Sequence, residues 1–371
     1  RFIDENGNEW RYSYDKLNRV TETVDANGNK ESFAYNARSE ITKMTNAAGD
    51  SRIYEYNPSG KLTHVVDFDG NEEFAEYNEL NKISKYTDKD GNSTFFEYDK
   101  MWNMSKTIDS EGGVNLYTYD GDGNLISQTD ANFNTREYSR DANGNIIRES
   151  DEDGNYTKYE YDELNRVKAV IYKDGTEEHI QYDALGNEVK FIDAAGNEWK
   201  SEYNLAGELT KRINPEGLET VYTYDLRGNL ISEETEGLIT KYECDKAGNI
   251  TKRISADGTE ETYTYDANGN MTGRITGGVH FSFSYDCLDR LINVKREGQA
   301  VKSYEYDKVG NRIAVTDALG NITRYIRSKA GDILTAIDPL GHETHYSYDK
   351  CHRLIGIDQS RGRVTIYTRD K

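Results

Sequence analysis

One dipeptide recurs along the whole chain at an almost constant interval, and this repeat constrains the fold more than any other feature. Tyr followed by Asp or Asn first occurs at Tyr14-Asp15 and returns every 21 residues. Eighteen such registers run from position 14 to position 369; 15 of the 17 intervals are 21 residues and two are 20. Fixed periods of this size indicate a repeat architecture. We therefore predict a single continuous array of about 18 repeats over residues 1–371, without separate domains.

Two columns of the repeat supply the residues that we expect to hold it together. Asp or Asn follows the register position in 17 of 18 units, and Gly stands seven residues before it in 16 of 18. The register is filled by a different residue at Arg140, Cys244, Arg327 and Arg369. The expected structural residues are the register tyrosines and representative turn glycines: Tyr14, Tyr35, Tyr56, Tyr77, Tyr98, Tyr119, Tyr161, Tyr182, Tyr203, Tyr224, Tyr265, Tyr285, Tyr306, Tyr348, Gly28, Gly196 and Gly258.

Each unit has the pattern of a β-hairpin. In residues 193–214, two alternating segments are separated by Asp-Ala-Ala-Gly-Asn and Asn-Leu-Ala-Gly. Period-two alternation between Gly/Asn turns is typical of hairpins, and the turn pattern suggests a type I turn followed by a glycine bulge. Eighteen units predict an all-β protein of about 36 strands, a strip that must curl because long open sheets twist. We expect one curved antiparallel sheet that spirals into a hollow shell or tube, with stacked aromatic ladders and no single compact core.

Composition excludes several classes of protein. The 29 Tyr, 32 Gly and 3 Pro do not suit a disordered linker, because tyrosines can bury apolar area. A net charge of −21 opposes nucleic-acid binding. No apolar run is long enough for a transmembrane helix, so we expect no membrane insertion. The chain starts at Arg1, and we expect it to be a fragment of a longer protein.

The columns resemble a known family. Residues 222–230 read Tyr-Thr-Tyr-Asp-Leu-Arg-Gly-Asn-Leu, and residues 263–271 read Tyr-Thr-Tyr-Asp-Ala-Asn-Gly-Asn-Met. Both look like the YD or RHS repeat of bacterial Rhs polymorphic toxins, insecticidal toxin-complex cocoon subunits, wall-associated bacterial proteins and the teneurin shell. The resemblance covers the whole chain. It implies hairpins in a spiralling sheet around a hollow that, in toxin members, holds a C-terminal toxic domain.

One motif of this chain resembles a region that follows the repeats in the toxin members. Their repeats are followed by a core region whose Asp residues release the toxin, and Asp338-Pro339 resembles part of it. Here the pair stands in the ordinary turn column, and Tyr348-Asp349 follows on schedule. We interpret it as a turn that contains Pro and assign no autoproteolysis to it.

Candidate metal sites are weak. The Asp-rich turns at residues 120–124 and 151–155 offer spaced oxygen ligands, but neither supplies the later bidentate Glu of an EF-hand. Backbone hydrogen bonding explains both turns. His342, His345, Cys351 and His352 form a local cluster in the sequence, but their spacing matches no zinc motif. We therefore expect neither a metal nor another cofactor.

Nucleophilic catalysis has no more support in the sequence than a metal site has. Cys244 replaces a register Tyr, which favours a packing role, and Cys287 and Cys351 occupy different turn positions that do not suggest disulfide pairing. Residues that depart from the columns mark either contacts or tolerated variation: Arg140, Phe133, Gln299, Glu188 and Arg312. Exposed Tyr and the three tryptophans, Trp10, Trp102 and Trp199, could stack on sugars, although wall packing explains the aromatic columns more simply.

The leading hypothesis is a noncatalytic structural shell segment. It would belong to an exported bacterial Rhs/YD protein, secreted or at the cell surface, that encloses and protects its own toxin or effector domain. The alternative is a cell-surface adhesion or carbohydrate-binding array whose partners are surface glycans. An enzyme is disfavoured. The expected compartment and cargo are implied by the resemblance alone, whereas the repeat and the sheet are predicted from the residues themselves.

Overall fold

The computed structural model describes residues 1–359 and 362–368, which form 36 β-strands and no helix. The strands of the first part of the chain are β1 (Phe2–Ile3), β2 (Glu9–Tyr14), β3 (Val20–Val24), β4 (Lys30–Tyr35), β5 (Ile41–Thr45), β6 (Ser51–Tyr56), β7 (Leu62–Val66), β8 (Glu72–Tyr77), β9 (Ile83–Thr87), β10 (Ser93–Tyr98), β11 (Met104–Ile108), β12 (Val114–Tyr119), β13 (Leu125–Thr129), β14 (Thr135–Arg140), β15 (Ile146–Ser150), β16 (Tyr156–Tyr161), β17 (Val167–Ile171) and β18 (Glu177–Tyr182).

The second part continues in the same rhythm. Its strands are β19 (Glu188–Ile192), β20 (Glu198–Tyr203), β21 (Leu209–Ile213), β22 (Glu219–Tyr224), β23 (Leu230–Thr235), β24 (Leu238–Cys244), β25 (Ile250–Ile254), β26 (Glu260–Tyr265), β27 (Met271–Thr276), β28 (Val279–Tyr285), β29 (Leu291–Arg296), β30 (Gln299–Tyr306), β31 (Arg312–Asp317), β32 (Ile322–Arg327), β33 (Ile333–Ile337), β34 (Glu343–Tyr348), β35 (Leu354–Gln359) and β36 (Arg363–Ile366).

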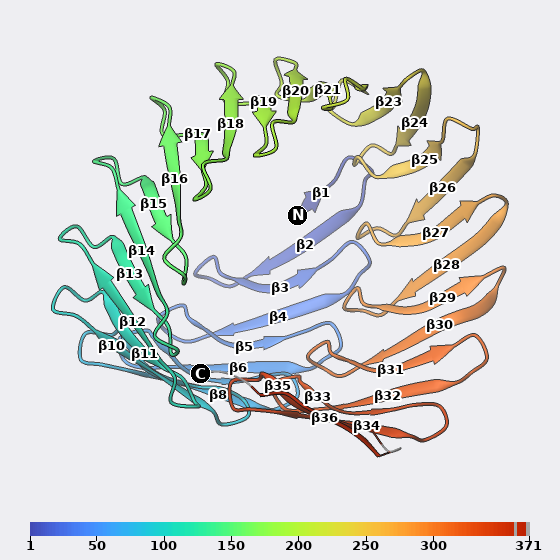
Figure 1. Cartoon of the computed structure of the whole chain (residues 1–371). Helices are drawn as coiled ribbons and strands as arrows, with labels where there is room; N and C mark the ends of the chain where they lie inside the picture. The colour runs from blue at the N-terminus through green and yellow to red at the C-terminus, as the bar shows by residue number, and fades with distance from the viewer. Residues whose placement is uncertain (360–361, 369–371) are drawn as a thin grey trace.

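The sheet is a continuous antiparallel meander. Each strand pairs with the strands before and after it in the chain, as β2 does with β1 and β3, and the first and last strands do not pair with each other. Figure 1 shows that the strip curls round so that the strands nearest the N-terminus lie beside β25 to β34. The predicted all-β class, strand number and spiralling sheet are therefore confirmed.

Most of the hairpin turns follow one geometry. At Asp15 the backbone N–H donates to the Arg19 carbonyl at 3.0 Å, and the Asn18 N–H donates back to the Asp15 carbonyl at 3.0 Å. Asp15 Oδ1 also accepts the Leu17 N–H at 2.8 Å. Asn18 has a φ of 63°, the left-handed conformation that Gly takes in most of these turns. These bonds match the predicted type I turn with a bulge, and the pairing register shifts between Ser13 and Tyr14.

The two 20-residue intervals have a structural cause. Each contains a hairpin with a two-residue loop in which both residues have positive φ, at Glu236-Gly237 and at Gly277-Gly278. Such tight turns match the twist of the strands and use fewer loop residues than the standard turn. A third pair, Glu297-Gly298, is compensated by a register shift between Val294 and Lys295, which keeps that interval at 21 residues.

The register tyrosines do more than pack. In eleven repeats the hydroxyl donates to the backbone carbonyl of the residue that opens the preceding strand, 14 or 15 positions earlier, as Tyr224 does to Leu209 at 2.9 Å. The tyrosines concerned are Tyr35, Tyr56, Tyr77, Tyr98, Tyr119, Tyr161, Tyr182, Tyr224, Tyr265, Tyr285 and Tyr306. Tyr14, Tyr203 and Tyr348 end β2, β20 and β34. Each bond ties one hairpin to the next.

The expected aromatic ladders are not found in the described residues, and three register tyrosines, Tyr35, Tyr182 and Tyr306, contact an arginine instead. The ring pairs found in the described residues do not join register tyrosines; they are Phe2–Trp10, His64–Phe74 and Phe191–Trp199. Where the turn ends in Arg, the guanidinium instead lies over the next register ring, at 4.6 Å for Arg19 over Tyr35. Adjacent register rings are a whole hairpin apart, and the arginine that ends one turn is long enough to reach the register ring of the next repeat.

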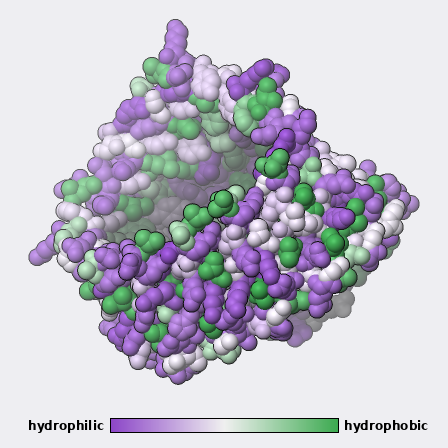
Figure 2. Space-filling model, turned by 90° about the horizontal axis from the view of Figure 1, so that it is seen from above, coloured by the Kyte–Doolittle hydropathy of each residue, from purple (hydrophilic) through white to green (hydrophobic). Residues whose placement is uncertain are grey.

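The wall is a single layer. The only buried apolar residues in the described part of the chain are Val65, Ala169 and Ala314, and each keeps a small exposed fraction. Figure 2 shows a deep hollow on the face seen from above, surrounded by mixed polar and apolar surface. The prediction of a hollow sheet without one compact core is confirmed. No segment of the described residues is a helix that could cross a membrane.

Candidate functional site

The most informative contacts join segments about 240 residues apart. Two kinds of hairpin turn lie on opposite edges of the strip: Tyr-Asp turns, which follow the register residue, and Asp-Gly turns, which contain the glycine of the glycine column. Asp-Gly turns between residues 4 and 113 contact Tyr-Asp turns between residues 245 and 353, at sequence separations mostly of 239–243 residues. We call this line of contact the seam, and the two layers that it joins the first and second windings.

The seam follows a positional rule. The residue just before the turn glycine of the first winding accepts a backbone N–H from a Tyr-Asp turn of the second. Asn6 accepts the Ala247 N–H at 3.3 Å, and Glu111 accepts that of Lys350 at 2.9 Å. Asn27 and Asp90 do the same with Ala267 and Lys329. Because these donors are main-chain groups, the seam depends mainly on an acceptor at one position of the repeat.

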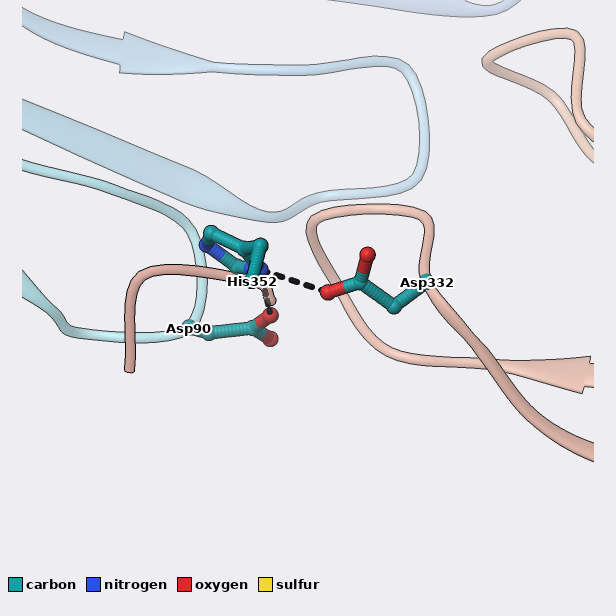
Figure 3. Close-up of side chains that lie close together, drawn as sticks. All are labelled: Asp90, Asp332 and His352. Atoms are coloured by element: carbon teal, nitrogen blue, oxygen red, sulfur yellow. Dashed lines mark hydrogen bonds and ion pairs between the residues drawn. The ribbon is translucent and has the colours of Figure 1, made fainter. Parts of the chain in front are cut away.

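A cluster of ionisable groups joins the two windings at His352. This residue lies in the turn between β34 and β35 with a φ of 61°. Its Nδ1 lies 2.5 Å from Asp332 Oδ2, and its Nε2 lies 2.9 Å from Asp88 Oδ2 in the turn between β9 and β10. Figure 3 shows the ring between Asp90 and Asp332. The hydrogen bonds to Asp88 and Asp332 raise the pKa of His352 to about 9, so the imidazolium form bridges the windings at neutral pH.

The same cluster is the place where a cation could bind. Ligand atoms of Asp90, Asp332 and His352 lie within 4.8 Å of one another. A metal ion would have to displace the proton on Nδ1, whereas that proton already bonds the nearest carboxylate. We therefore treat the cluster as an ionic clasp of the seam.

The structure separates the residues that cluster in the sequence. His342 Nδ1 contacts Asp338 at 2.7 Å within its own turn, and His345 contacts Glu343 at 3.2 Å on β34. Cys351 lies at the seam, with its Sγ 3.5 Å from Ser110 Oγ of the first winding. His352 alone joins the clasp. Sequence reasoning singled out His352 but could not find its partners, because Asp88 is 264 residues away.

The Asp-rich turns use their carboxylates internally. Asp151 accepts the N–H groups of Asp153 and Asn155 at 3.0 and 2.8 Å, and its second oxygen accepts Asn155 Nδ2 at 2.7 Å. The side-chain bond from Asn155 lowers the pKa of Asp151. Asp120 makes the same bonds with Asp122 and Asn124. Asp338 likewise closes an ordinary turn by accepting the Leu340 and His342 N–H groups.

The other candidates are dispersed. Cys244, Cys287 and Cys351 are free thiols, and burial raises the pKa of Cys244. Trp10 and Trp199 each pack against a neighbouring Phe, whereas Trp102 occupies a turn with a φ of 68°. The Asp-Gly edge carries two open cavities. One, of about 370 Å³, lies at the seam, and one, of about 470 Å³, lies on the Asp-Gly edge around Asp151 and Asp174.

Two family models match the chain. The family model described as Teneurin YD-shell matches residues 175–371, which is more than half of the chain. The RHS Repeat model matches residues 1–30, 35–72, 119–147 and 140–177. The chain belongs to the YD-shell family of RHS-repeat proteins. No curated protein matches this YD-shell chain.

Solved structures share the YD-shell fold at low identity. A TcdB2-TccC3-TEV structure has a TM-score of 0.81 at 17% identity and covers 96% of this chain, and TcdB2-TccC3 has 0.80 at 16% with the same coverage. A Tc holotoxin pore from Photorhabdus luminescens has 0.68 at 16% identity and covers 99%. The present chain spans about a quarter of the length of each, 24% for the first two and 25% for the third.

Proposed function

We propose that this chain is a noncatalytic wall segment of a secreted or cell-surface shell that encloses a toxin or effector domain. The observation that carries the proposal is the seam. The strip is only one strand length wide, so without contacts between its edges a gap would separate one winding from the next. The seam closes that gap with repeated hydrogen bonds and with the clasp at His352. A sealed wall around a hollow is what keeping a cargo away from solvent and proteases requires.

The fold of the toxin-complex structures supports this proposal, as does the lack of a compact core in the described residues. A thin wall with polar groups on both faces is poorly suited to a catalytic pocket, which needs convergent groups in a concave, desolvated site. The cargo is proposed to be a domain of the same protein, because a closed wall offers a separate chain no way in after folding.

Protease protection tests the proposal. The protein purified from its natural source is digested with proteinase K under native conditions, and the surviving fragments are identified by mass spectrometry. We expect a protected polypeptide without YD repeats that becomes digestible after denaturation. The same digestion of a His352→Gln variant should expose that polypeptide sooner. If only the repeats survive and every flanking segment is lost, the chain is an open array and not an enclosure.

A further inference from the structure

Three of the four Asn-Gly dipeptides in the chain lie at the seam. Asn6-Gly7 and Asn27-Gly28 stand in Asp-Gly turns of the first winding, and Asn268-Gly269 stands in a Tyr-Asp turn of the second. The fourth, Asn143-Gly144, lies in a Tyr-Asp turn outside the seam. Asn-Gly is the dipeptide most prone to deamidation, because Gly has no side chain to hinder the attack of its backbone nitrogen on the Asn side chain.

Two of the seam sites face each other in identical turns. Both turns read Asp-Ala-Asn-Gly-Asn, and they begin at Asp25 and Asp266. Asn27 Nδ2 donates to Asp266 Oδ2 at 3.1 Å, and Asn268 Nδ2 donates to Asp25 Oδ2 at 2.7 Å. Each turn thus donates an amide N–H to the first carboxylate of the other turn, so both Asn side chains are held across the seam.

The closed seam hinders deamidation at these two sites. The reaction needs the side-chain carbonyl carbon of Asn to turn onto the backbone nitrogen of the following Gly. At Asn27 this rotation breaks two bonds, the one to Asp266 and the one in which Asn27 Oδ1 accepts the Ala267 N–H at 3.2 Å. Asn268 Nδ2 lies 3.0 Å from Asp289 Oδ2 and so has a second carboxylate partner besides the one across the seam. Such bonds prevent the rotation until the segment opens locally.

Asn143 is an internal reference for the seam sites. It stands in the same pentapeptide, which here begins at Asp141. The Gly144 N–H donates to the Asp141 carbonyl at 3.1 Å, and the same bond closes the two seam turns. In the described residues the Asn143 side chain donates only to Asn165 Oδ1, at 3.0 Å, in the adjacent turn. The seam sites therefore differ from Asn143 in their contacts with the other winding.

Deamidation replaces a donor by a negative charge where carboxylates already gather. At Asn268 the product carboxylate would lie beside Asp25 and Asp289, which accept the amide N–H groups of the unmodified residue. Another part of the seam shows the effect of one such pair: burial and the charge of Asp307 across the seam raise the pKa of Asp69. Like charges at close range destabilise each other, so a deamidated site weakens the contact between the windings.

We propose that Asn6, Asn27 and Asn268 are modification sites whose deamidation keeps the seam open once it has opened. The backbone nitrogen of the following Gly attacks the side-chain carbonyl carbon, and its proton passes through water to the side-chain NH₂ group, which leaves as ammonia. Water then opens the cyclic imide to aspartate or isoaspartate, so the net change is one water taken up and one ammonia released. The inference concerns the seam alone and does not rest on the shell function proposed above.

The rate of deamidation at each site gives the first test. The folded 371-residue chain is incubated in mildly alkaline buffer, and peptide mapping by mass spectrometry measures the Asn, Asp and isoaspartate forms. We expect Asn143 to react about tenfold faster than Asn27 and Asn268. In urea the three sites should react at one rate, because the two residues on either side of each are identical. Equal rates at Asn143 and the two seam sites in the folded chain would overturn the proposal.

Ala267→Pro opens one site without changing it. The substitution removes the N–H that Asn27 accepts across the seam, and Pro suits this turn position, which Pro58 holds in another Tyr-Asp turn. It should raise the rate at Asn27 close to that at Asn143. Ala142→Pro, the same change beside Asn143, is the matched control and should leave the rate at Asn27 unchanged. If Ala267→Pro keeps its circular dichroism and Asn27 reacts no faster, the seam does not protect the site and the proposal fails.

Asn268→Asp tests the consequence of modification, because it introduces the charge that deamidation would produce. We expect hydrogen exchange of the Ala267 N–H, which donates across the seam, to become about tenfold faster. Asn143→Asp makes the same change in the same pentapeptide outside the seam, and it should leave that exchange as it is in the native chain. Exchange in Asn268→Asp as slow as in the native chain would refute the idea that a modified site holds the seam open.

Discussion

A disulfide across the seam gives the most direct measurement of its geometry. Ser110 Oγ lies 3.5 Å from Cys351 Sγ, and Ser110 also donates to the Lys350 carbonyl at 2.7 Å. Ser110→Cys would place two thiols within reach of a bond after a shift of about 1.5 Å. The cross-link closes a loop of 241 residues. For that length the chain-entropy relation gives about 5.5 kcal/mol of stabilisation at 25 °C, and strain in the folded state reduces it.

The assay compares oxidised and reduced Ser110→Cys protein. We expect spontaneous oxidation in air, a mass loss corresponding to two hydrogens, and an unfolding free energy in urea about 3–5 kcal/mol higher than after reduction. Ala194→Cys is the control, because Ala194 holds the same position in an Asp-Gly turn that the second winding does not cover. If Ser110→Cys keeps all its thiols as the control does, the two windings do not meet in the register described here.

Three further perturbations have defined outcomes. His352→Gln should lower the unfolding free energy by about 1–2 kcal/mol at pH 7, a value that allows for the partial exposure of His352. Because folding raises the pKa of His352 to about 9, the difference in unfolding free energy between the native protein and the variant should be full below about pH 6.5. It should vanish as the pH rises through 9, which unfolding curves recorded at a series of pH values will measure. Phe133→Gly should raise the melting temperature by relieving a φ of 70° at an 88% exposed side chain, worth about 1 kcal/mol; an unchanged or lower value would contradict the strain. Tyr224→Phe should cost about 1 kcal/mol in urea unfolding because the Leu209 carbonyl loses its donor, and an equal cost for the exposed Tyr14→Phe would refute that cause.

Local features could be predicted from the sequence because their causes are local. A Gly or Asn after two turn residues, as at Asn18 and Gly28, dictates the left-handed conformation and hence the hairpin. The alternation of apolar residues then dictates the strand faces, and the constant interval dictates the array. The hydroxyl bond of Tyr224 was missed because alternation says which face a side chain takes and not which carbonyl it reaches.

The seam could not be predicted from the sequence. Which Tyr-Asp turn meets Asp90 depends on the twist and bend accumulated over more than twenty strands, and small changes per strand add up to a different partner. The clasp shows the same limit, since His352 and Asp88 are unremarkable residues until the curvature of the sheet brings them together. A signal was nevertheless present, in the polar residue before the turn glycine at Asn6, Asn27 and Glu111.

The use of main-chain donors in the seam has a consequence for how such a wall can change length. Every Tyr-Asp turn presents nearly the same backbone, so deleting one 21-residue unit moves each winding along by one turn and offers Asn6 or Glu111 a donor like the one it lost. A single-residue deletion is absorbed at a tight loop such as Gly277-Gly278 without disturbing neighbouring strands. The circumference is set by curvature per strand, so added units extend the tube along its axis. A wall built this way can be lengthened or shortened in whole repeats while the contacts of its seam are kept.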